Sequence, residues 1–259
     1  MTHGGARPTA SGAPAVLGSE VIVLTGAYGS GKTELALNLA AYLAGRRPFD
    51  SLAWPPGAVP PPPPARKGVT LIDLDTVKPY FRARELEQAF RGFGVRFLGA
   101  AEGFAHADVP ALSPAILGAL RLGRERVVID LAGEEAGARV LRGLLQSAPN
   151  RRVAFLLVVN PFRPFTGDAP AIAATGAALA AAADLDLTGV VANPQLLDQT
   201  TEDQVIRGYQ EVARAAGELG IPVAWAAARA ELCPSLARRL PVPVFAIQRF
   251  LRPPWERSS

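Results

Sequence analysis

The residues that could do chemistry in this chain begin with the octapeptide GAYGSGKT, which fits the pattern G-x-x-x-x-G-K-[ST]. Glycines in such a loop let the backbone curl round a phosphate without Cβ clashes, and successive amide N–H groups form a nest for the anion. Lys32 is then expected to reach the β- and γ-phosphates of a nucleotide, and the Thr33 hydroxyl to hold Mg²⁺. The cofactor-binding residues predicted in and beside the loop are Gly26, Tyr28, Gly29, Ser30, Gly31, Lys32, Thr33 and Glu34.

Two apolar runs end in carboxylates that suit a magnesium-dependent phosphoryl reaction. Asp130 follows Val127–Ile129 in the form of a Walker B strand, and Gly133 stands three residues later. Asp130 is expected to hold Mg²⁺ and the Gly133 amide to sense the γ-phosphate, so this loop is a candidate nucleotide-driven switch.

Asp73 and Asp75 end another apolar run and, by strand alternation, point to one face. Asp73 is a candidate Mg²⁺ ligand and Asp75 a candidate for orienting an attacking water, although one of them could only cap the following loop. The predicted catalytic residues are therefore Lys32, Asp75 and Asp130.

The elements that must position these residues follow from the hydrophobic pattern. Apolar runs alternate with segments of helical periodicity, which predicts an α/β fold with a mostly parallel sheet and helices on both faces. Strands are expected at 21–24, 69–75, 95–98, 126–131, 153–159, 187–192, 222–226 and 242–247, the last at an edge because Pro241 and Pro243 limit pairing. Helices are expected at 34–43, 81–93, 113–122, 134–147, 169–183 and 201–219.

Polar residues follow several of these strands at the edge where ligands bind in such sheets. They are Asp75, Asp130, Asn160 and Asn193. Each alone could end a strand only because Asp and Asn suit turns. Because all four are expected on the edge that carries the glycine loop, a functional role is favoured. Arg163 and Thr166 follow the strand at 153–159, either to contact a substrate or partner or to pack a loop.

The chain of 259 residues is expected to hold one domain at 19–250, because 49% of its residues are hydrophobic. Residues 1–18 are expected to be a disordered tail, 46–67 a proline-rich exposed loop and 251–259 a second tail.

The composition also bounds the location and the partners of the chain. The single cysteine excludes an internal disulfide, so the cytoplasm is the expected location. No stretch is long and apolar enough for a membrane helix. The formal charge of +4 is scattered, so nucleic acid is not favoured as a partner but stays open.

The order of these motifs resembles the MinD/ParA-type P-loop ATPases, also called the CobQ/CobB/MinD/ParA nucleotide-binding family. The likeness covers about residues 20 to 250 and rests on GAYGSGKT, Leu71–Asp75, Ile129–Gly133 and Val190–Asn193. It implies ATP and Mg²⁺ as cofactors, slow hydrolysis of ATP to ADP and phosphate, and a nucleotide-driven switch that acts on an unidentified protein partner. It also implies that Asp75 serves hydrolysis, that Asp130 lies near Mg²⁺ and that Asn193 reads adenine.

One departure from this family concerns the loop itself, where the signature lysine position holds Ala27. An ATP-promoted homodimer is still implied, but it would need another cation, such as Arg82 or Arg84. Two other interpretations stay open: a small-molecule kinase or ligase with an acceptor pocket at 99–112 plus Arg163, and an ATP-gated binding module without turnover. ATP is expected over GTP, because Asn193 is followed by Pro194 and Gln195 rather than by a guanine-reading motif.

Overall fold

The computed structural model describes residues 12–45, 52–58, 68–74, 90–99 and 114–251. Asp75, Arg82 and Arg84 lie outside these ranges, as do the proline run at 60–64 and the tail from residue 252. What the sequence predicts for them stays a prediction. None of the described helices combines the length and the apolar character needed to cross a membrane.

One sheet organises the described part of the chain, with the strand order β2-β9-β8-β7-β6-β1-β5-β3-β4. All its pairings are parallel except that of β2 with β9. The prediction of a mostly parallel α/β sheet is confirmed. The strands are β1 (Val21–Thr25), β2 (Leu52–Ala53), β3 (Val69–Leu74), β4 (Val95–Gly99), β5 (Arg126–Leu131), β6 (Val153–Val159), β7 (Gly189–Ala192), β8 (Val223–Arg229) and β9 (Val244–Ile247).

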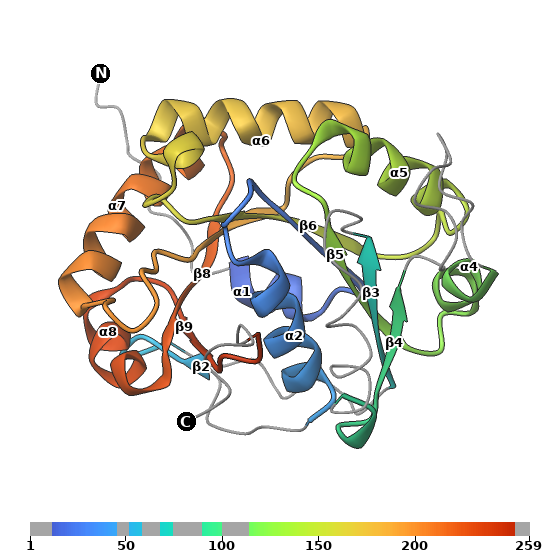
Figure 1. Ribbon diagram of the computed structural model, residues 1–259, viewed down its shortest axis with the longest axis horizontal. Helices are drawn as coiled ribbons and strands as arrows, with labels where there is room; N and C mark the ends of the chain where they lie inside the picture. Colours follow the sequence, from blue (N-terminus) through green and yellow to red (C-terminus); the bar gives the residue numbers. More distant parts are fainter. Residues whose placement is uncertain (1–11, 46–51, 59–67, 75–89, 100–113, 252–259) are drawn as a thin grey trace.

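Helices cover both faces of the sheet, as Figure 1 shows. One apolar cluster joins a sheet face to helices α4 to α8, and a second joins the opposite face to α1 and α2. Each face is thus sealed from water, which explains why the strands are apolar on both sides. The helices are α1 (Gly12–Leu17), α2 (Lys32–Leu43), α4 (Pro114–Leu122), α5 (Glu135–Gln146), α6 (Ala169–Ala183), α7 (Glu202–Glu218) and α8 (Cys233–Arg239), with short 3₁₀ turns η2 (Pro164–Thr166) and η3 (Ala230–Leu232).

Local chemistry sets the ends of the best predicted helices. The Asp168 side chain caps α6 by accepting a hydrogen bond from the Ala171 amide at 2.9 Å. Thr201 and Gln204 form a reciprocal capping box at the start of α7. Such caps satisfy amide donors that the first helical turn leaves without partners.

Three local predictions are wrong. Residues 12–17 form α1, which buries Ala13, Val16 and Leu17, so the chain is ordered there rather than a tail. Residues 52–53 form β2 within the segment expected to be an exposed loop. Because β2 pairs with β9, β9 is not the edge strand that its flanking prolines suggested.

Strand β1 occupies the position that matters for a ligand. It lies between β5 and β6, and the chain crosses from one side of β1 to the other between those two strands. In open parallel sheets, ligands bind beyond the carboxyl ends of strands where the strand order reverses. The loop from Gly26 to Gly31 follows β1 and therefore stands at this place.

Candidate phosphate-binding site

Glycines shape the loop between β1 and α2 because neighbouring groups leave no room for a side chain. Gly26, Gly29 and Gly31 all have positive φ angles, of 152°, 78° and 85°. A Cβ on Gly26 would lie 2.2 Å from the Val158 carbonyl oxygen, and one on Gly31 would lie 2.3 Å from Asn193 Nδ2. The loop therefore packs closely against β6 and against Asn193 after β7, in a shape that side-chain-bearing residues would not adopt.

Helix α2 starts at Lys32 with its N-terminus open toward this loop. Its N-cap, Gly31, provides no side-chain hydrogen bond. The first helical turn therefore presents the positive end of α2 to the loop, as in helix termini that bind phosphate. Lys32 is buried and 7% exposed, whereas Tyr28 at the outer side of the loop is 88% exposed.

A buried hydroxyl in the loop points to a polar ligand. Ser30 Oγ is buried and has no hydrogen-bond partner among the described residues. Buried polar atoms are nearly always paired in folded proteins, so each orphan needs an explanation. A phosphate oxygen in the nest would provide the missing partner for Ser30.

The two carboxylates expected near Mg²⁺ lie side by side in the sheet. Asp73 on β3 and Asp130 on β5 are register partners, and Asp130 is buried. By alternation from Leu71 and Val128, which pack in the cluster with α2, both carboxylates point to the face that α2 covers. Thr33 stands in the first turn of that helix, so the structure brings the three predicted Mg²⁺ ligands to one side of the sheet edge.

This set of residues fits Mg²⁺ bound together with a nucleotide. Among the described residues, no group of three or more His, Cys, Asp or Glu side chains could hold a metal ion by itself. Mg²⁺ commonly uses one or two carboxylates and completes its shell with substrate phosphates and water. Asp130, Asp73 and the Thr33 hydroxyl would supply the protein's share of such a shell.

Gly133 lies directly against the phosphate loop, as a switch would require. A Cβ on Gly133 would be 1.8 Å from the Gly26 carbonyl oxygen and 3.2 Å from the Ala27 nitrogen. Thr25 Oγ1 also donates a hydrogen bond to the Ala132 carbonyl at 3.4 Å. The segment after Asp130 therefore cannot move without affecting the first residues of the loop.

The Asn193 side chain serves the phosphate loop itself. Its Nδ2 donates a hydrogen bond of 2.7 Å to the Ser30 carbonyl, and the residue is buried. The amide that was expected to read adenine thus ties the end of β7 to the loop. A base-reading role for Asn193 stays a prediction, and its anchoring contact is what sequence reasoning missed.

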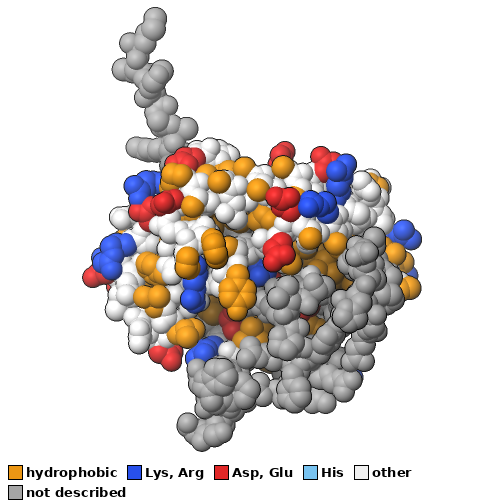
Figure 2. All heavy atoms as spheres, turned by 45° about the horizontal axis from the view of Figure 1, so that its top comes forward, with side chains coloured by type: hydrophobic (Ala, Val, Ile, Leu, Met, Phe, Trp, Pro, Cys, Tyr) orange, Lys and Arg blue, Asp and Glu red, His pale blue; other side chains and the backbone are white. Residues whose placement is uncertain are grey.

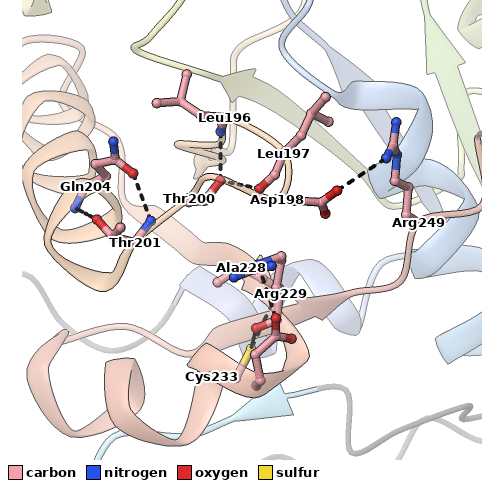
Figure 3. A network of polar contacts seen from close by, with 11 residues as sticks. Leu196, Leu197, Asp198, Thr200, Thr201, Gln204, Ala228, Arg229, Cys233 and Arg249 are labelled. Carbon is pink, nitrogen blue, oxygen red and sulfur yellow. Dashed lines mark hydrogen bonds and ion pairs between the residues drawn. The ribbon is translucent and has the colours of Figure 1, made fainter.

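Hydrogen bonds fix the two loops that follow β6 and β7 at this edge. Asn160 Nδ2 donates to the Gln195 carbonyl at 3.0 Å, which joins the loop after β6 to the loop after β7. In the latter, Thr200 Oγ1 accepts from the Leu196 amide at 2.8 Å and donates to the Leu197 carbonyl at 2.7 Å (Figure 3). Asn160 is therefore a structural residue of the edge.

Arg163 and Thr166, which the sequence left undecided, separate clearly in the structure. Thr166 is buried and its hydroxyl donates to the Asn160 carbonyl at 2.8 Å, so it packs the turn. The side chain of Arg163 lies over Gly29, where an added Cβ would meet its Nε at 3.1 Å. Of the two, only Arg163 reaches the phosphate loop.

The Glu34 side chain is engaged with the C-terminal segment. Its carboxylate accepts hydrogen bonds from the backbone amides of Phe250 and Leu251, so it anchors the C-terminal segment to α2. Burial raises the pKa of Glu34 above its ordinary value, while these amides and Arg249 act in the opposite direction. Because the Glu34 side chain is used in this way, only its backbone amide is left to bind the cofactor, and that role stays a prediction.

A small hollow at the other end of the sheet does not compete with this site. It is lined in part by Glu20, Glu125, Arg126 and Arg152, near the start of β1 and β5. Arg126 and Arg152 donate to the carbonyls of Leu17 and Gly18, at 2.7 and 3.2 Å. These two arginines therefore already hold the chain at the end of α1 and just after it, and the phosphate loop is left as the candidate site.

No protein-family model and no curated protein matches the sequence. Similar solved structures include FlhF complexed with GTP and Mg²⁺, with a TM-score of 0.48, 14% identity, and coverage of 83% of this chain and 68% of that chain. FtsY from Mycoplasma mycoides gives a TM-score of 0.47, 18% identity, and coverage of 79% and 58%. FtsY from Thermotoga maritima gives 0.45, 23% identity, and coverage of 79% and 60%. The chain thus spans less than two thirds of either FtsY chain, and at this level of similarity the likeness concerns only the α/β architecture.

Proposed function

We propose that the chain binds ATP with Mg²⁺ and hydrolyses it slowly, and that the segment from Asp130 to Gly133 reports the state of the nucleotide. The observation that supports this most is the phosphate loop itself, in which the buried Ser30 hydroxyl has no hydrogen-bond partner among the described residues and Gly26 packs against Gly133. A loop that is rigid, amide-rich and short of an anionic partner is suited to a phosphate chain.

The roles of the residues follow from their positions. The loop amides and Lys32 would hold the phosphate chain, while Thr33, Asp130 and Asp73 would hold Mg²⁺, which supplies charge neutralisation when bound. Asp75 would orient the attacking water. Since a γ-phosphate would lie near Gly133, its loss after hydrolysis would release the 130–133 segment and change the adjoining surface.

The choice of ATP over GTP depends on the resemblance to the MinD/ParA-type ATPases. Asn193 supports it less directly than the sequence suggested, since one of its amide hydrogens is used by Ser30. The other donor and the Oδ1 acceptor are still suited to the N6 and N7 edge of adenine. A partner protein or a second copy of the chain would read the switch.

A binding experiment with matched variants tests this function. Wild-type chain and Lys32→Ala are titrated with ATP and with GTP, each with Mg²⁺, by calorimetry. We expect ATP to bind wild type more tightly than GTP, and Lys32→Ala to lose about tenfold to a hundredfold in affinity, as for a lost charged hydrogen bond. Equal affinity of wild type and Lys32→Ala would contradict the loop assignment, and equal affinity for the two nucleotides would contradict the choice of ATP.

Hydrolysis is measured on the same samples. Phosphate release should be slow in wild type and slower still in Asp130→Asn, because the amide is a poorer Mg²⁺ ligand than the carboxylate. Binding without any phosphate release would replace the ATPase by an ATP-gated binding module.

A further inference from the structure

Arg163 lies against the phosphate loop although it comes from a different strand. It follows β6, and a Cβ on Gly29 would stand 3.1 Å from Arg163 Nε and 3.2 Å from its Cδ. The stem of the arginine thus runs across the loop at Gly29. The absence of a side chain at Gly29 makes room for it.

The turn that carries Arg163 is held in place by Asn160. The Arg163 amide donates to the Asn160 carbonyl at 3.2 Å, and Asn160 Oδ1 accepts from the Phe162 amide at 3.1 Å. The Thr166 amide in turn donates to the Arg163 carbonyl at 3.1 Å. Because its backbone is fixed at both sides, the guanidinium is presented to the loop at little further cost in chain entropy.

The Nε–H of Arg163 lacks the acceptor that its burial calls for. The atom is buried and, among the described residues, has no hydrogen-bond partner. Ser30 Oγ, in the same loop, is in the same condition. Two buried donors without acceptors at one loop point to an acceptor-rich, anionic group that belongs between them.

On the basis of the proposed function, on which this inference rests, we propose that Arg163 binds the phosphate chain of the nucleotide as a second cation beside Lys32. The planar guanidinium presents several N–H donors and suits phosphate oxygens better than a lysine would. Arg163 would thereby link the loop after β6 to the nucleotide. The loops after β1, β5 and β6 would then all contact one ligand.

Substitutions that keep the packing and remove the charge test this role. Arg163→Met preserves an apolar stem over Gly29, Arg163→Lys preserves a charge, and Arg214→Met is the control, since Arg214 is exposed on α7 and pairs with Glu211. With MgATP in calorimetry we expect Arg163→Met to lose at least tenfold in affinity, Arg163→Lys to lose less, and Arg214→Met to match wild type. The dependence of affinity on salt should also be weaker in Arg163→Met, because fewer charges then contact the phosphates.

A measurement on the wild-type chain removes any dependence on how the variants fold. The Nε–H resonance of Arg163, assigned by its absence from Arg163→Lys, should shift on addition of MgADP or MgATP. If wild type binds nucleotide and Lys32→Ala does not, but Arg163→Met binds within twofold of wild type or the resonance stays unmoved, Arg163 is overturned as a phosphate ligand and the proposed function stands. If wild type binds neither ATP nor GTP, the proposed function itself fails.

Discussion

At the scale of single residues, the contact between Gly133 and Gly26 gives the sharpest prediction. Gly133→Ala would place a methyl group 1.8 Å from the Gly26 carbonyl oxygen, so one of the two segments must shift. We expect a loss of about 1–3 kcal/mol in the free energy of unfolding, typical of overpacking, with at least a tenfold loss of nucleotide affinity. Denaturant unfolding and calorimetry measure the two effects.

The control for this change is Gly143→Ala. Gly143 is exposed in α5, and a Cβ there would meet nothing within 4 Å. An alanine inside a helix is favoured by roughly 0.5–1 kcal/mol over glycine, so this variant should be slightly more stable and bind nucleotide normally. Equal stability and equal nucleotide affinity of Gly133→Ala and Gly143→Ala would contradict a role for the close contact between Gly133 and Gly26.

The site residues that could be predicted are those whose positions depend on the local sequence motif. The motif from Gly26 to Thr33 places a loop and a helix start by short-range chemistry, and the structure has them there. Glu34 and Arg163 were not predictable in the same way. Glu34 meets amides more than two hundred positions later, and Arg163 reaches Gly29 only because β6 lies beside β1.

At the scale of elements, α8 carries the only cysteine, and its thiol is predicted to be inert in the folded chain. Cys233 is buried, and its Sγ donates to the Arg229 carbonyl at 3.3 Å (Figure 3). Burial, with a smaller contribution from Glu231, raises the pKa of the Cys233 thiol to about 12. Because the thiolate is the reactive form, a disulfide reagent at pH 8 should react only as fast as the chain opens.

The pH dependence of stability follows from the same shift. The folded-state pKa of Cys233 lies above the unfolded value, so its contribution to stability is complete below about pH 8.5 and is lost as pH rises toward 12. Unfolding in denaturant at a series of pH values measures this loss.

The labelling of the Cys233 thiol is followed by the absorbance of the released reagent, with and without denaturant. Rapid labelling of the native chain at pH 8 would show that α8 is not packed as described.

Elements with strong local signals were predicted well, and those made by long-range pairing were not. β6 is an uninterrupted apolar run stopped by Asn160 and Pro161, and its bounds match the prediction. α6 also matches, with Asp168 as its cap. β2 has only two residues, and its pairing with β9 stabilises it more than its own sequence does, so no periodicity revealed it.

At the scale of the whole molecule, the sheet edge with the phosphate loop carries three exposed large apolar side chains. Tyr28, Phe165 and Leu197 are exposed and follow the carboxyl ends of the neighbouring strands β1, β6 and β7. Figure 2 shows apolar side chains near the middle of one face of the molecule, with charged groups between them. Exposed apolar groups around a ligand site favour a partner surface.

The last prediction concerns a second copy of the chain on this face. We predict that the chain forms a homodimer when ATP is bound, in which the nucleotide would lie between these exposed apolar side chains. Phe165→Ser should weaken such a dimer about tenfold, because large apolar side chains dominate interface energies, while nucleotide binding by the monomer is kept. The matched control is Leu122→Ser: Leu122 is 65% exposed, compared with 73% for Phe165, and lies near the start of β5, at the opposite edge. Sedimentation with MgATP, with MgADP and without nucleotide should show the dimer only with MgATP in wild type and Leu122→Ser, and little or none in Phe165→Ser. A monomer under all three conditions would contradict self-association and leave an unrelated protein as the reader of the switch.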